Sequence, residues 1–192
     1  MNPHVVLASA SPRRRELLRN VVSEFEVDSA DVDEALLPGE TPQAASERLA
    51  LEKARVVAAR HPSATVIGSD TIVALEGPEG WRMLGKPESQ TNARAMLREL
   101  SGKKHLVITG VAIVQGGREQ AFSVPAWVSF RELTDAEIAG YVATGEPMDK
   151  AGAYAIQGGA AGFVTALDGP MDTVIGLPCE ELSRRLGWAM RP

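Results

Sequence analysis

A short segment near the start of the chain combines two serines, a proline and three consecutive arginines, residue types that could bind an anion. Ser11 is a favoured N-cap residue and Pro12 suits the first helical position, so the sequence predicts a helix that begins here. Each exposed arginine at this end of a helix interacts unfavourably with the helix dipole, at a cost of roughly 0.3–1 kcal/mol. A bound phosphate would instead be attracted by both the dipole and the arginines. The segment therefore predicts a phosphate site formed by Ser9, Ser11, Arg13 and Arg14, with a solvated basic turn as the alternative.

Two lysines occupy positions where a cation could be directed at a ligand. Lys53 falls on the apolar side of a helix expected over 41–60, and a buried ammonium is costly unless it meets a partner. Its stem either extends to solvent or carries the charge into a cleft toward an anion. Lys86 lies between a glycine and a proline on a constrained loop, where ordinary turn chemistry is the alternative. The apolar positions that define the helix face are Ala45, Leu49, Val56 and Val57.

Acidic residues follow two of the expected strands, a place where α/β proteins often bind ligands. Asp70 comes after an apolar run over 64–67 and could hold a metal or act as a base; a turn carboxylate bonded to its own backbone is the alternative. Glu34 follows the strand expected at 25–27, in an acidic cluster with Asp31 and Asp33. It could supply a second metal-binding carboxylate, the alternative being a solvated loop. Gln157, in a glycine-rich stretch, can both donate and accept hydrogen bonds, as recognition of a base requires.

The elements that must position these residues alternate between strand-like and helix-like patterns. Strand-like runs cover 4–8, 25–27, 64–67, 71–75, 105–114 and 120–130. Helical patterns cover 13–22, 41–60, 92–100, 135–144 and 180–186, whereas 152–162 is expected to be loop. Gly116 and Gly117 predict a hairpin turn, and Thr134 is a favoured N-cap. The alternation predicts an α/β protein, and the hairpin favours a mixed sheet over a purely parallel one.

The bulk composition is that of a globular protein. The chain has 192 residues, 44% of them hydrophobic and 23% charged, and a net charge of −5. Nucleic-acid-binding proteins usually gather a basic excess on one face, so the acidic balance argues against that class. We find neither an apolar run of the roughly 18–20 residues that span a bilayer nor a secretory signal. With a single cysteine, Cys179, these features predict a cytoplasmic protein with no membrane or nucleic-acid partner.

Common signatures of nucleotide, metal and hydrolase sites are missing from the sequence. It contains no Walker A pattern, GxGxxG, CxxC pair, HExxH or GxSxG. The three histidines, His4, His61 and His105, lie far apart and show no zinc-ligand spacing. Each candidate residue on its own is therefore a hypothesis.

Taken together, however, a series of ordered blocks resembles the Maf (septum formation inhibitor) family over nearly the whole chain. The blocks are Leu7-Ala8-Ser9-Ala10-Ser11-Pro12-Arg13-Arg14, Glu34, 47–54, Ile67-Gly68-Ser69-Asp70-Thr71-Ile72-Val73, Leu84-Gly85-Lys86-Pro87, 101–105, 109–111, 145–158 and Ile175-Gly176-Leu177-Pro178. The resemblance implies one Maf-like domain over 1–192, with a Maf/inosine-triphosphatase-like α/β fold. In that fold a twisted mixed sheet with flanking helices forms two lobes around a central cleft, without an independent linker. It also implies a homodimer, a divalent cation (Mg²⁺ or Mn²⁺) and a nucleoside triphosphate substrate cut between its α- and β-phosphates.

Within that family, the stretches 146–152 and 156–158 are similar to the branch that prefers dTTP and UTP. By this resemblance Asp70 is the catalytic carboxylate, and Arg13, Thr71 and Gln157 match positions that tune the choice of base. An acidic residue, Asp172, departs from the polar residues usual for this branch, and Ala155 stands where glycine is expected. These departures leave the preferred base open.

The resulting hypothesis is a nucleoside triphosphate pyrophosphatase. Arg13, Lys53 and Lys86 are expected to hold the phosphates, while Asp70 and Glu34 hold the cation and water attacks the α-phosphorus. Asp70 is either a direct base or chiefly a metal ligand, and the weak basicity of a carboxylate favours the second role. The alternatives are a nucleotide-binding regulator of cell division without turnover, and a 7-methyl-GTP pyrophosphatase.

Overall fold

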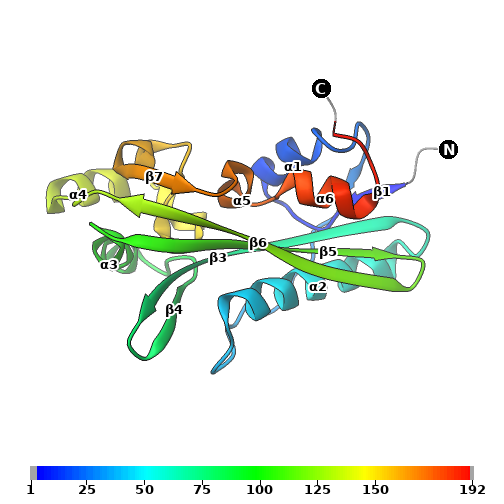
Figure 1. The fold of residues 1–192 in the computed structure, drawn as a ribbon, viewed down its shortest axis with the longest axis horizontal. Helices are drawn as coiled ribbons and strands as arrows, with labels where there is room; N and C mark the ends of the chain where they lie inside the picture. Colours follow the sequence, from blue (N-terminus) through cyan, green and yellow to red (C-terminus); the bar gives the residue numbers. More distant parts are fainter. Residues whose placement is uncertain (1–3, 191–192) are drawn as a thin grey trace. The chain divides into compact units, whose positions relative to one another are not determined.

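The computed structural model describes residues 4–190, and its strands belong to one mixed sheet (Figure 1). The strands are β1 (Val5–Leu7), β2 (Glu26–Val27), β3 (Thr65–Gly77), β4 (Gly80–Leu84), β5 (Lys104–Gln115), β6 (Arg118–Phe130) and β7 (Val164–Asp168). Their order is β2-β1-β3-β5-β6-β7, with β4 paired to β3. Strand β1 runs parallel to β2 and β3, whereas the β3–β4 and β6–β7 pairs are antiparallel. The predicted α/β class with a mixed sheet is confirmed.

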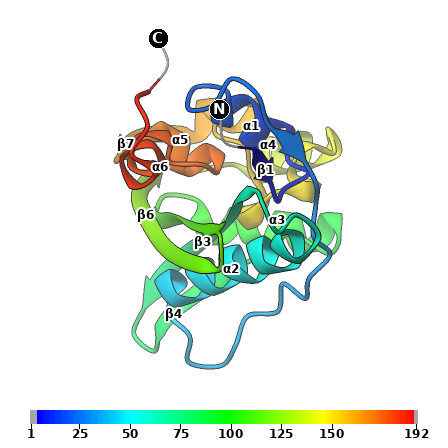
Figure 2. The same cartoon turned by 90° about the vertical axis from the view of Figure 1, so that its right-hand side faces the viewer.

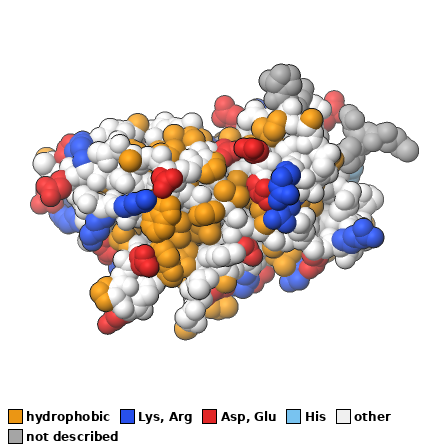
Figure 3. Space-filling view, in the orientation of Figure 1, with side chains coloured by type: hydrophobic (Ala, Val, Ile, Leu, Met, Phe, Trp, Pro, Cys, Tyr) orange, Lys and Arg blue, Asp and Glu red, His pale blue; other side chains and the backbone are white. Residues whose placement is uncertain are grey.

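The helices alternate with these strands along the chain. They are α1 (Pro12–Leu18), α2 (Pro42–Arg60), α3 (Gln90–Leu100), α4 (Asp135–Ala143), α5 (Met171–Ile175) and α6 (Cys179–Leu186), with the short 3-10 helices η1 (Glu146–Asp149), η2 (Ala151–Ala153) and η3 (Gly159–Phe163). Among residues 4–190, no helix is both long and apolar enough to cross a bilayer. On the face drawn in Figure 3, basic and acidic side chains lie interspersed, with hydrophobic side chains gathered between them.

The chain divides into two compact units. The first contains Met1–Thr71, Thr109–Val124 and Gly176–Pro192, and the second contains Ile72–Ile108 and Pro125–Ile175. Strands β3, β5 and β6 each contribute residues to both units. Each unit has a hydrophobic core of its own.

In the first unit, helices cover both faces of the sheet. Alternate residues of β1 face opposite ways, so that Val5 and Leu7 join one buried cluster and Val6 joins another. The cluster of Val5 and Leu7 includes residues of α1 and α6, whereas the cluster of Val6 includes residues of α2. Figure 2 shows α2 on one side of these strands and α1 with α6 on the other.

Helix α2 lies unusually close to the strands because glycines face it. A Cβ added to Gly68 in β3 would lie 2.2 Å from the carbonyl oxygen of Ala50, and one added to Gly110 in β5 would lie 2.2 Å from that of Ser46. Alanines on the helix side, including Ala54, keep the gap equally small. This close packing fixes which α2 side chains face the sheet.

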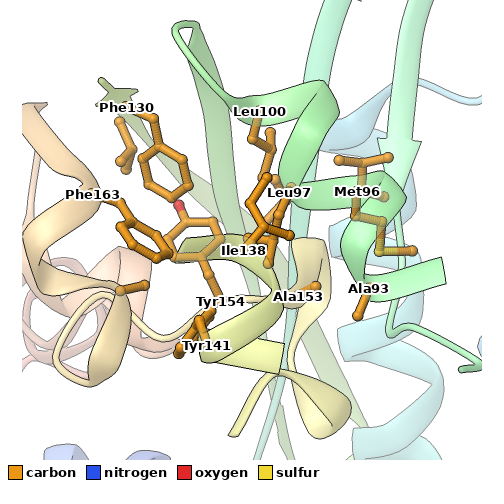
Figure 4. Close-up of a cluster of buried hydrophobic side chains, with 14 of the residues drawn as sticks. Ala93, Met96, Leu97, Leu100, Phe130, Ile138, Tyr141, Ala153, Tyr154 and Phe163 are labelled. Carbon is orange, nitrogen blue, oxygen red and sulfur yellow. The ribbon is translucent and has the colours of Figure 1, made fainter. Parts of the chain in front are cut away.

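The second unit has an aromatic core. Phe130, Tyr154 and Phe163 pack edge to face with ring centroids 4.8–6.0 Å apart, beside buried residues of α3 and α4 (Figure 4). Helix α4 begins at a capping box in which Thr134 and Glu137 satisfy each other's backbone groups, as the predicted N-cap requires.

Several local expectations were wrong. The strand predicted to end before Asp70 runs without a break from Thr65 to Gly77, because the polar residues at its centre all find side-chain or backbone partners. Helix α1 ends at Leu18 rather than near Val22, since the next backbone bonds tighten to i→i−3 at Asn20. Val56, predicted to lie on the apolar face of α2, is 40% exposed. Elements β4, β7 and α5 were not expected.

Candidate active site

Lys53 lies on the buried face of α2 and contacts two carboxylates. Buried positions recur along α2 every three to four residues, and Lys53 is one of them, with only 7% of its surface exposed. Its Nζ is 2.5 Å from Asp70 Oδ1 and 2.7 Å from Glu34 Oε1. The structure therefore brings together a helix lysine, a strand aspartate and a loop glutamate, and the lysine does not extend its stem to solvent.

Asp70 is held inside the first unit by the same packing that places α2. Its neighbour two residues earlier is Gly68, whose missing side chain lets Ala50 and Ala54 approach β3. Lys53 lies between these alanines in the α2 sequence, so its side chain reaches Asp70 across the short gap. The prediction placed Asp70 beyond a strand end, but its carboxylate is presented from the middle of β3.

Arg14, the second of the consecutive arginines, forms the most contacts around this cluster. Its Nε donates to the carbonyl of Gly176 at 2.9 Å, and its two terminal nitrogens donate to Thr71 Oγ1 at 2.9 Å and Ser9 Oγ at 3.4 Å. Burial lowers the pKa of the Arg14 guanidinium, while the charges of Asp70 and Glu34 act to raise it. The positive charge of Arg13 lowers the pKa of Arg14 further.

Hydroxyl groups complete the cluster. Ser11 caps α1 by accepting a bond from the Arg14 backbone N–H at 3.5 Å, as the N-cap prediction requires. Thr71 Oγ1, besides accepting from Arg14, lies 2.9 Å from Thr109 Oγ1. The predicted residues Ser9, Ser11, Arg13, Arg14, Glu34, Lys53, Asp70 and Thr71 thus all belong to the first unit.

Three further residues of this cluster were missed by the sequence reading. Ser69 Oγ donates to the Gly176 carbonyl at 2.8 Å, the same oxygen that Arg14 contacts. Gly176 has φ +126°, and a Cβ there would lie 3.0 Å from Arg14 Nε. Thr109 is the third member. Each lay within a block that carried the family resemblance, but neither residue type nor spacing distinguished it from turn or strand chemistry.

The two remaining candidates, Lys86 and Gln157, belong to the second unit. Lys86 is exposed on the loop after β4, and Gln157 is exposed between η2 and η3. Backbone contacts tie their loops together, since the Gly152 N–H donates to the Gly85 carbonyl at 3.1 Å. Their participation in the site stays a prediction.

Comparison with known proteins decides the family. A family model described as "Maf-like protein" matches residues 4–188. This chain belongs to the Maf family. Several Maf relatives are similar to this chain over almost their whole length. The chain is 50% identical over 177 residues to the dTTP/UTP pyrophosphatase of Myxococcus xanthus (strain DK1622), and the match covers 92% of this chain and 88% of that protein.

Two other relatives of this Maf chain carry the same name. The dTTP/UTP pyrophosphatase of Geobacter metallireducens (strain ATCC 53774 / DSM 7210 / GS-15) is 50% identical over 182 residues, covering 93% of each chain. That of Geobacillus sp. (strain WCH70) is 44% identical over 187 residues, covering 96% of this chain and 98% of the relative. Among solved structures, the Staphylococcus aureus Ham1 protein has a similar fold, with a TM-score of 0.53 at 16% identity over 96% of this chain and 98% of that one.

Proposed function

We propose that this Maf chain hydrolyses dTTP and UTP to the nucleoside monophosphate and pyrophosphate. Relatives about half identical to it are named dTTP/UTP pyrophosphatase and match nearly its full length. The observation that carries the proposal is the contact of one buried ammonium with two carboxylates, Lys53 with Asp70 and Glu34. Burying an ammonium is costly, so a buried lysine within a polar cluster indicates a site that acts on a charged ligand.

The cations of the cluster would bind the phosphate chain. A triphosphate carries about four negative charges, so its cleavage depends mainly on where positive groups are placed. Arg13, Arg14 and Lys53 supply three cations in the first unit, and the hydroxyls of Ser9 and Ser11 add neutral donors. Because Arg14 already donates to Thr71 and Gly176, it would fix the orientation of its neighbours as well as contribute charge.

Asp70 and Glu34 are the residues that would hold a divalent cation. Their oxygens fit the preference of Mg²⁺ and Mn²⁺ for hard ligands, and both approach one positive group, the Lys53 ammonium, to within 2.7 Å. When bound, the cation would neutralise phosphate charge and lower the pKa of a coordinated water.

In the proposed reaction, water attacks the α-phosphorus and the bond to the bridging oxygen breaks, releasing pyrophosphate. Asp70 would orient this water and accept its hydrogen bond, while Lys53 holds the carboxylate in place. Lys86 and Gln157, from the second unit, would contact the phosphates and the base respectively. Thr71 would contribute to the choice of base.

The first test is the product formed from a panel of triphosphates. Purified protein is incubated with dTTP, UTP, the other common nucleotides and 7-methyl-GTP, with Mg²⁺ or Mn²⁺, and pyrophosphate and orthophosphate are quantified separately. We expect pyrophosphate, with dTTP and UTP cleaved fastest. Saturable nucleotide binding without pyrophosphate release would instead support the regulator, and cleavage of 7-methyl-GTP alone would contradict the proposed substrates.

The second test is Asp70→Asn. We expect pyrophosphate release to fall by at least about a hundredfold, the usual loss when a charged group acting on the reacting atoms is removed. The fold should persist because Lys53 keeps its contact with Glu34. Asp168→Asn is the matched control, since this carboxylate is exposed at the end of β7 and pairs only loosely, at 3.4 Å, with Lys104. Wild-type turnover by Asp70→Asn would remove Asp70 from the mechanism.

A further inference from the structure

Two histidines that lie far apart in the sequence meet beside a glutamate in the first unit. His4 precedes β1, Glu26 begins β2, and His61 follows the last residue of α2. One ligand atom from each, a ring nitrogen of each histidine and a carboxylate oxygen of Glu26, can be chosen so that all lie within 4.8 Å of one another. These three side chains take no part in the contacts of Lys53 or Arg14 described above.

Backbone hydrogen bonds and strand pairing hold all three residues in position. The His4 carbonyl accepts a bond from the Thr65 N–H at 2.8 Å, which anchors it to the start of β3. The His61 N–H donates to Val57 and its carbonyl accepts from Ala64 at 3.0 Å. Glu26 is in the strand that pairs with β1, in register with Val6. Only the side chains would need to adjust to a ligand.

We propose that His4, Glu26 and His61 bind one zinc ion at this place. Two imidazoles and a carboxylate are a ligand set that suits zinc and other late divalent transition metals, whereas Mg²⁺ and Ca²⁺ prefer oxygen alone. Ligands about 2.0–2.2 Å from a tetrahedral zinc ion lie roughly 3.4 Å from each other. His4 Nε2 and Glu26 Oε1 are already 3.0 Å apart, and small movements of the three side chains would bring one ligand atom of each to this spacing.

A second carboxylate supports the His61 ring. Asp28 Oδ2 lies 3.0 Å from His61 Nε2, and the same oxygen pairs with Arg60 Nε at 2.9 Å. A carboxylate beside a metal-binding imidazole fixes the orientation of the ring and raises its basicity. Because Arg60 already neutralises Asp28, we assign Asp28 this positioning role and leave the ion to the three other side chains.

Zinc bound here would join three elements of the first unit: the start of β1, the edge strand β2 and the end of α2. Any ligand that binds the folded chain better than the unfolded chain raises the temperature of unfolding. The site would therefore stabilise the first unit, independently of any reaction at Asp70.

The test is zinc binding by the untagged full chain, measured by titration calorimetry in excess Mg²⁺ so that oxygen-only sites are occupied. We expect one equivalent of Zn²⁺ to bind the wild type and to raise its melting temperature. His4→Gln and His61→Gln should each weaken binding at least tenfold, and the double variant should lose the thermal shift. Glu24→Gln is the matched control: it removes an exposed carboxylate two residues from Glu26 and should bind zinc like the wild type.

A second measurement needs no variant. The chain has three histidines, so ¹⁵N spectra of the imidazoles contain three ring systems. Zinc should shift the signals of two of them and leave the buried His105 unchanged. Unshifted His4 and His61 signals, or equal zinc affinity of the wild type and the double variant, would overturn the proposal.

Discussion

At the scale of single residues, the cluster depends on charges that are nearly matched and tightly packed. Lys53 serves two carboxylates at once, and Arg14 uses three nitrogens on three different oxygens. A lysine in place of Arg14 would keep the charge but could not reproduce the planar fork that reaches Ser9, Thr71 and Gly176 together. The type of cation therefore matters as much as its sign.

Arg14→Lys should raise the KM for dTTP by about tenfold or more, because the bonds that hold Ser9, Thr71 and Gly176 around the phosphate site would be lost. Hydrogen bonds to charged groups each contribute about 1.5–3 kcal/mol, and about 1.4 kcal/mol corresponds to tenfold in affinity. Steady-state kinetics would measure this. Arg15→Lys is the control, since Arg15 is exposed on the same helix turn and should leave KM unchanged. Equal effects of the two substitutions would show that only the summed charge of this segment matters.

At the scale of elements, the position of α2 depends on glycines, whose lack of a side chain lets the helix approach the sheet. Gly68 in β3 and Gly110 in β5 leave room for the helix backbone, and the alanines of α2 fill that room closely. Lys53 and Asp70 come from these two facing elements, so their 2.5 Å contact depends on the spacing between helix and sheet. A change in packing beneath α2 is thus a change in the cluster.

Gly68→Ala and Gly110→Ala should each destabilise the protein by about 1–3 kcal/mol, the usual effect of overpacking, and should also lower turnover. Denaturant unfolding and pyrophosphate release would be measured on the same samples. Gly140→Ala in α4 is the control: its added methyl meets no described heavy atom within 4 Å, and alanine is the better helix former. A stable, fully active Gly68→Ala would mean that α2 can shift without cost.

At the scale of the whole molecule, two units with separate cores share the three long strands β3, β5 and β6. His105 lies in the core of the second unit, fully buried between Phe130 and Tyr154, with its Nε2 2.8 Å from the Tyr154 hydroxyl. Burial lowers the pKa of His105 to about 4. The folded chain therefore keeps this imidazole neutral at pH values where the unfolded chain protonates it.

Stability should consequently fall with acidification. Above about pH 6.5 His105 is neutral in both states; between that value and about pH 4 only the unfolded chain takes up the proton, so the free energy of unfolding decreases. The loss should reach about 3 kcal/mol, since one pKa unit corresponds to about 1.4 kcal/mol. Denaturant titrations across this range would show a shallower pH dependence for His105→Gln than for the wild type. Parallel curves would mean that other groups cause the loss.

Local chemistry in the sequence determined much of this protein by itself. The caps at Ser11 and Thr134, the diglycine hairpin after β5 and the helical periodicity of α2 act over a few residues, so each could be recognised without the fold. The same periodicity placed Lys53 on the buried face, and the ordered blocks identified the family. These features predicted the α/β class and most of the helices and strands.

Only the tertiary structure decided how the functional groups meet. Asp70 proved to lie inside β3, Arg14 rather than Arg13 proved to bridge the cluster, and His4 proved to meet His61. Each outcome rests on contacts between distant parts of the chain, such as the bond from Arg14 to Gly176 across 162 positions. The spacing of residues along the chain does not predict such contacts, because the packing of helices on a sheet, and not sequence distance, determines which side chains lie close together.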